Sequence, residues 1–149
     1  HKSPAESIMA LSMSPRCDSV LSLGADYNLV RSALHLEAVP HVQRIKRPGH
    51  ACASVRWDEQ VCVLGGWDAC ARVFTWPSLE PLAKLAYHKD SIYALSFVRH
   101  DAVHVLHAHL DESSDEDAEA TSASRQLLLA CGSKDGRISL WNETFTKKP

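Results

Sequence analysis

Two stretches of the chain share one pattern of apolar and polar positions. Each has an apolar run, then Gly-x-x-Asp, then an alternating run that ends in a large aromatic residue; they span residues 61–74 and 128–141. A weaker copy spans residues 20–30. Short alternating apolar runs predict strands, and the Gly and Asp between them predict a tight turn. A repeated strand–turn–strand unit indicates a repeat architecture.

The turn aspartates give the length of the repeat. Asp26 and Asp68 are 42 residues apart, and Asp68 and Asp135 are 67 residues apart. The longer interval contains an acidic, Ser-rich segment, residues 101–124, and without it the interval is 43 residues. A four-stranded blade of a β-propeller repeats after about 40–45 residues. The spacing therefore predicts propeller blades with an insertion in the last one.

The remaining strands of each blade follow from the same pattern. Opening strands are predicted at 8–13, 52–57 and 92–97, and fourth strands at 41–45 and 81–85. The expected fold is all-β, with blades at about 1–47, 48–87 and 88–149 and nearly no helix outside the insertion. Three blades cannot close a ring of about 4–8. We therefore expect the C-terminal part of a longer, seven-bladed propeller.

The turn residues suggest a structural network. The Gly is expected to give the backbone conformational freedom at the hairpin. The carboxylate of Asp135 can accept hydrogen bonds from its own turn and from His88, and the Trp141 indole can add a donor. Such a network pins strand order only if every member is satisfied.

This His–Asp–Trp set resembles that of the WD-repeat family at His88, Asp135 and Trp141. The second repeat departs from the family pattern, because Pro48 stands near the histidine position and Phe74 replaces the tryptophan. The first repeat departs further, with Ser32 or Ala33 at the aromatic position. The candidate structural residues of the turns are Asp26, Asp68, His88, Asp135 and Trp141.

A closer resemblance rests on two longer motifs. Gly-Trp-Asp-x-x-x-Arg-Val-Phe-x-Trp at 66–76, followed by Pro-Leu-Ala-x-Leu at 81–85 and His88, resembles the penultimate blade of the ASTRA-associated, G-protein-β-like WD-repeat proteins. The run 133–141 is similar to their last blade. The resemblance implies a noncatalytic nuclear and cytoplasmic scaffold in a multi-subunit assembly. This assembly would act with the co-chaperone complex that matures phosphatidylinositol-3-kinase-related kinases, with a link to chromatin regulation. The alternative is a G-protein-β-type signalling propeller that binds an α-type partner.

Composition narrows the function classes. Hydrophobic residues make up 45% and charged residues 23%, as in ordinary globular domains. No apolar run approaches the ~20 residues of a membrane span. The five cysteines form no C-x-x-C pair, which favours a reduced, intracellular protein without disulfides. No phosphate-binding Gly loop, catalytic carboxylate pair or metal motif stands out. We expect no enzyme activity, no cofactor and no small-molecule substrate.

The charges are unevenly distributed. Residues 111–119 hold six acidic side chains, and the rest of the chain has 16 basic against 12 acidic residues. No basic run interleaves with aromatics, so direct nucleic-acid binding is not expected. Ser113 and Ser114 each have an acidic residue three positions on, which makes them candidate phosphosites for an acid-directed kinase. We expect residues 101–124 to be a disordered insertion of the last blade, and we favour a solvated loop whose like charges repel over an essential role for it.

Four histidines stand at the start of the insertion: His100, His104, His107 and His109. Their spacing fits no closed tetrahedral site, and no cysteine stands near them. We therefore favour a loop over a metal site.

Overall fold

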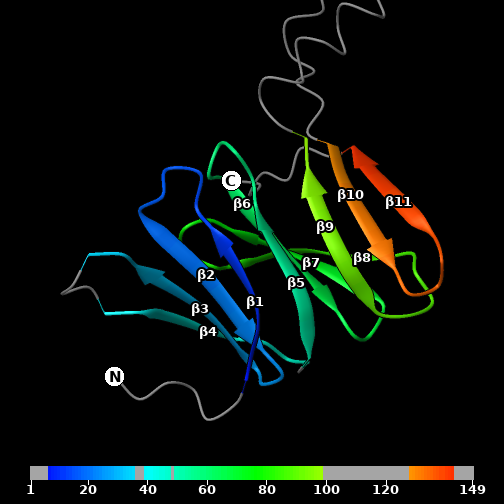
Figure 1. Ribbon diagram of the computed structural model, residues 1–149, viewed down its shortest axis with the longest axis horizontal. Helices are drawn as coiled ribbons and strands as arrows, with labels where there is room; N and C mark the ends of the chain where they lie inside the picture. Colours follow the sequence, from blue (N-terminus) through cyan, green and yellow to red (C-terminus); the bar gives the residue numbers. More distant parts are fainter. Residues whose placement is uncertain (1–6, 36–38, 48, 99–127, 143–149) are drawn as a thin grey trace, which may run out of the picture.

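The computed structural model describes residues 7–35, 39–47, 49–98 and 128–142. Within these ranges it contains strands and no helix, and the strands form three antiparallel sheets (Figure 1). The all-β fold class predicted from the repeats is confirmed.

Each sheet follows the chain order of its strands. The first sheet has the order β1-β2-β3-β4, with β1 (Ile8–Met13), β2 (Ser19–Gly24), β3 (Asn28–Ala33) and β4 (His41–Arg44). The second has the order β5-β6-β7-β8, with β5 (His50–Val55), β6 (Val61–Gly66), β7 (Cys70–Thr75) and β8 (Pro81–Ala86). The third, among the described residues, has β9 (Ile92–Phe97), β10 (Leu128–Ser133) and β11 (Ile138–Asn142), with β10 in the middle.

The strand registers show that the sheets are copies of one unit. A β-bulge lies beside the same strand pair in each sheet: Ala10–Leu23, Cys52–Gly65 and Ala94–Gly132. Counting from these pairs, Asp26, Asp68 and Asp135 occupy equivalent positions in the turns that follow. The same register corrects one predicted strand: β5 begins at His50, two residues before the expected start, because His50 pairs with Gly66.

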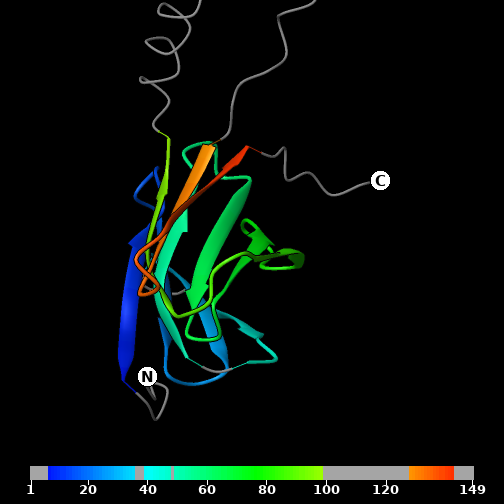
Figure 2. The ribbon, with the colours of Figure 1, turned by 90° about the vertical axis from the view of Figure 1, so that its right-hand side faces the viewer.

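The sheets pack side by side through two apolar cores. The inner strands β1, β5 and β9 are neighbours (Figure 1), and in the side view β1 runs along the left edge of the molecule (Figure 2). Between the first and second sheets lie, among others, Leu21, Leu23, Leu29, Cys62, Leu64 and Phe74. Between the second and third lie Val61, Val63, Val73, Ile92, Leu129 and Cys131. The alternation along each strand places these side chains on the faces that meet.

In the second sheet, the Gly of the Gly-x-x-Asp motif, Gly65, is required for space rather than for backbone freedom. A Cβ added to Gly65 would collide with the Cys52 sulfur and would lie 2.9 Å from the Ile92 carbonyl oxygen of the next sheet. The left-handed backbone falls instead on the residue after the aspartate, with φ of 63° at Ala69 and 76° at Gly136. The expected conformational role of the motif glycine was therefore wrong. Close packing between sheets replaces it at Gly65, whereas a Cβ on Gly132 would lie 3.3 Å from the Ala94 Cβ of its own sheet.

Candidate functional site

The aspartate turns gather at one end of the three sheets (Figure 1). The links from β4 to β5 and from β8 to β9 reach the same end, because β4 and β8 run parallel to β2 and β6. We call this end the turn face; its described residues are 25–27, 45–47, 49, 67–69, 87–91 and 134–137.

A hydrogen-bonded chain crosses the third sheet at this end. The Nδ1 of His88 lies 3.2 Å from Oδ2 of Asp135, and its Nε2 lies 2.9 Å from Oγ of Ser139. The indole N–H of Trp141 donates to the same Ser139 oxygen at 2.9 Å. Because an ionised carboxylate only accepts, Nδ1 of His88 donates to it; in the neutral imidazole, Nε2 is then the acceptor for the Ser139 hydroxyl proton. The structure thus brings together His88, Asp135 and Trp141, and it adds Ser139.

Sequence reasoning missed Ser139 as the link between the histidine and the tryptophan. The available signal was the strand alternation, which puts residues 139 and 141 on the same face of β11. Asp135 also accepts the backbone N–H groups of Lys89 and Arg137. These bonds, with that of Lys89 the largest contributor, hold the pKa of Asp135 at about 2.

The order Ser–His–Asp also occurs in hydrolases, where the serine must be open to a substrate. Here Ser139 is buried, with 8% of its surface exposed, and its oxygen already accepts the Trp141 N–H. The His88 side chain is 2% exposed. The arrangement therefore ties the β8–β9 link to the β10–β11 turn and to β11.

In the second sheet, the turn aspartate has a different hydrogen-bond partner. Arg72 occupies the register position of Ser139, and its guanidinium donates two hydrogen bonds to Asp68, which lower the pKa of that carboxyl. Phe74 takes the place of Trp141 and is buried. Pro48, expected near the histidine position, lies outside the described residues.

His50 is buried beside this ion pair. Only 1% of its surface is exposed, and within the described part of the chain its Nε2 has no hydrogen-bond partner. Burial, and then the positive charge of Arg72, lower the pKa of His50 to about 4. His50 is therefore neutral at physiological pH, and it stands where Ile92 stands in the third sheet.

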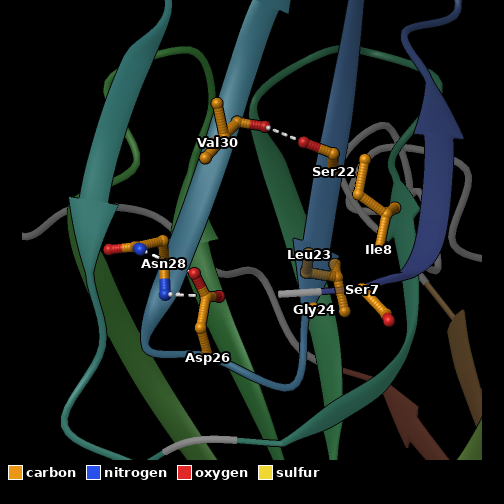
Figure 3. A pocket seen from close by; sticks show the side chains of 8 residues that line it. All are labelled: Ser7, Ile8, Ser22, Leu23, Gly24, Asp26, Asn28 and Val30. Carbon is orange, nitrogen blue, oxygen red and sulfur yellow. Dashed lines mark hydrogen bonds between the residues drawn. The ribbon is translucent and has the colours of Figure 1, made fainter. Parts of the chain in front are cut away.

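The first sheet satisfies its aspartate locally. Asp26 accepts the backbone N–H of Asn28 at 3.0 Å and its side-chain amide at 2.7 Å (Figure 3). Val30 and Ser32 occupy the register positions of Ser139 and Trp141. The hollow lined by these turn residues measures about 10 Å³, room for about one water molecule. It is too small for a ligand.

Several residues singled out in the sequence lie outside the described ranges, namely Ser113, Ser114, the four histidines and the rest of the 101–124 segment. Within the described ranges, no group of three or more His, Cys, Asp or Glu side chains is arranged to hold a metal ion. No helix in those ranges is long and apolar enough to cross a membrane. All five cysteines carry free thiols.

Exposed aromatic side chains mark the turn face. Tyr27, Trp67 and Tyr87 stand in the β2–β3 turn, the β6–β7 turn and the β8–β9 link, and 43%, 43% and 53% of their surfaces are exposed. The Trp67 ring is held so closely against Gly49 that an added Cβ would collide with it. Large, fixed aromatic side chains are enriched at protein–protein interfaces. The turn face is therefore the candidate interaction surface.

The chain is similar to several known proteins. Guanine nucleotide-binding protein subunit beta-like protein 1 of Mus musculus is 31% identical over 104 residues, which are 70% of this chain and 24% of that protein. ASTRA-associated protein 1 of Schizosaccharomyces japonicus is 32% identical over 124 residues, 80% of this chain and 27% of that protein. ASTRA-associated protein 1 of Verticillium alfalfae is 28% identical and covers 93% of this chain and 39% of that protein.

The chain thus spans between about a quarter and two fifths of the length of these relatives. No protein-family model matches it. Two solved structures, described as U3-55K and as the RRP9 WD40 repeats, superpose with a TM-score of 0.72 at 16% identity. Each match covers 95% of this chain and 37% of the solved chain, and at this identity it shows the fold alone. The three sheets are therefore WD40-type propeller blades, and the chain resembles the ASTRA-associated and G-protein-β-like WD-repeat proteins.

Proposed function

We propose that the protein is a noncatalytic protein–protein interaction scaffold of an ASTRA-type assembly. This assembly acts with the co-chaperone complex that matures phosphatidylinositol-3-kinase-related kinases and has a link to chromatin regulation. The observation that carries the proposal is the similarity to ASTRA-associated protein 1 over 93% of the chain. The proposed places of action are the nucleus and the cytoplasm.

The geometry of the blades supports the scaffold part of the proposal. The polar side chains of the turns hold strands together: Asp135 with His88, Asp68 with Arg72, and Asp26 with Asn28. The exposed aromatics of the turn face remain available for a partner. These features fit a rigid platform that binds proteins.

A second candidate function is a G-protein-β-type signalling propeller, favoured by the name of the mouse relative. It would bind an α-type subunit instead of kinase-maturation proteins. Because propellers host many functions, the fold does not choose between the two.

The two candidates differ in the proteins that should co-purify with the full-length protein. A tagged copy would be purified from its source cells, beside untagged cells as a control, and its partners identified by mass spectrometry. We expect co-chaperone subunits and kinases of the phosphatidylinositol-3-kinase-related class. Recovery of a G-protein α subunit without them would support the second candidate, and recovery of neither would contradict both.

A further inference from the structure

A basic groove lies where the first and second sheets meet. It has a volume of about 430 Å³ and is formed by the end of β4 and by β7 and β8. Four basic residues line it, Arg44, Lys46, Arg72 and Lys84, and no acidic residue does. Most of the other lining residues are apolar, among them Pro81 and Leu82.

Three of the four basic side chains form no ion pair within the described part of the chain. Arg72 is paired with Asp68, whereas Arg44, Lys46 and Lys84 are exposed and have no carboxylate within 4 Å there. Lys84 stands directly opposite Arg72 in the β7–β8 register, and the charge of the Asp68 carboxylate that pairs with Arg72 also acts on Lys84.

The groove also positions its charges. The Arg44 guanidinium lies 5.8 Å from the centre of the Tyr27 ring, a cation–π distance that fixes its place at the rim. The two guanidinium nitrogens of Arg72 that bond Asp68 fix the second arginine. Fixed cations lose less entropy on binding than free ones.

The basic lining is not a property of the repeat. The equivalent seam between the second and third sheets also has a hollow, lined by Tyr87, Ile138, Ser139, Leu140 and Trp141, none of which is charged. In the register of the sheets, Arg72 corresponds to Ser139, and Arg44 corresponds to Ala86. Among the described residues, Arg44 and Arg72 therefore have no charged counterpart at the second seam.

We propose that this groove binds an acidic peptide segment of a protein partner. Carboxylates or phosphates of the segment contact Arg44, Lys46 and Lys84, and an apolar side chain of the segment packs against Pro81 and Leu82. Charge complementarity between a groove without acidic residues and such a segment favours this occupant. The inference rests on the proposed function only in that the protein is a scaffold.

The test measures binding of a labelled short peptide of Glu, Asp and Leu to the full-length protein by fluorescence anisotropy. The same peptide with Gln and Asn in place of the acids is the ligand control. We expect the acidic peptide alone to bind, more weakly at higher salt. Lys46→Glu/Lys84→Glu should weaken binding about tenfold or more, since close charge pairs at interfaces are worth about 1.5 kcal/mol or above.

A control variant tests whether the weaker binding comes from the groove or from the change in net charge. Lys134→Glu/Arg137→Glu changes the net charge equally, but its residues stand in the β10–β11 turn, away from the groove. It should bind the peptide as the wild type does. Equal weakening by both variants, or no effect of the groove variant, would overturn the proposal. The proposal would also be overturned if the groove variant lost binding of a labelled single-stranded oligonucleotide but kept binding of the peptide.

The peptide-binding experiment and the co-purification experiment can fail independently of each other. If kinase-maturation proteins co-purify while the acidic peptide does not bind, only the groove inference fails. If the peptide binds through the groove while those proteins are absent, the proposed assembly is wrong and the groove inference stands.

Discussion

Asp26, Asp68 and Asp135 occupy one position in three blades, yet each carboxylate binds a different partner. The residue four positions after the aspartate, on the following strand, also differs: it is Val30, Arg72 or Ser139. In the third sheet, where this residue is Ser139, His88 lies between the Asp135 carboxylate and the Ser139 hydroxyl. In the second sheet, where it is Arg72, the guanidinium donates directly to the carboxylate of the turn aspartate. The network around an unchanged aspartate thus differs between the second and third sheets together with two positions, Arg72 against Ser139 and Phe74 against Trp141.

Beside the Arg72–Asp68 pair, His50 is buried and neutral, and this predicts that the stability of the protein depends on pH. The pKa of His50 is about 4 in the folded protein and 6.5 when unperturbed. Between these values the unfolded state binds a proton and the native state does not, so the free energy of unfolding falls as pH falls. The contribution is at most about 1.4 kcal/mol per pH unit within that window. Above pH 6.5 His50 is neutral in both states and does not lower the free energy of unfolding; the loss accumulates as pH falls from 6.5 to about 4.

Replacing His50 by isoleucine, the residue at the equivalent position of β9, removes the titrating group. Urea unfolding of the full-length protein between pH 4 and 6.5 should show a shallower slope for His50→Ile than for the wild type. His41→Ile, at an exposed histidine of β4, should keep the wild-type slope. An unchanged slope in His50→Ile would mean that His50 is protonated or solvated in the native state.

At the scale of strands, the sequence was most informative where one face is buried. Short runs of apolar or small residues, bounded by polar, Pro or Gly segments, predicted β1 and β9 with the bounds that the structure has. The link through Ser139 was missed, since a serine in an alternating strand looks like any half-buried polar residue. The groove was missed for another reason: its residues come from β4 and from β7 and β8, and their proximity depends on how two blades pack.

Ser139 offers the sharpest test of the network in the third sheet. Ser139→Ala leaves the His88 Nε2 and the Trp141 N–H without their shared partner in a buried place. An unpaired buried group costs about 1–3 kcal/mol, so the variant should lose free energy of unfolding in that range. Denaturant unfolding would measure the loss. Ser96→Ala, at an exposed serine of the same sheet, should change stability little; a Ser139→Ala variant as stable as that control would rule out the network's stabilising role.

At the scale of the molecule, the row of blades has an apolar face at each end. Met9, Leu11 and Met13 of β1 are 48%, 62% and 51% exposed, and Ile138 and Leu140 of β11 are 75% and 70% exposed. In a propeller such faces pack against further blades, as the faces of the second sheet do here on both sides. Apolar patches left open on a protein surface drive association.

We therefore expect residues 1–149, produced alone, to self-associate as concentration rises. Association should pair these two end faces, because each presents the kind of surface that a neighbouring blade covers. Leu11→Glu/Leu140→Glu places a carboxylate on both faces and should shift the chain toward monomer in sedimentation velocity. Leu34→Glu/Val39→Glu changes the charge equally at exposed apolar residues outside the strands and should leave association as it was. If the wild-type chain stayed monomeric at high concentration, the two apolar end faces would not drive association in water, and this prediction would be wrong.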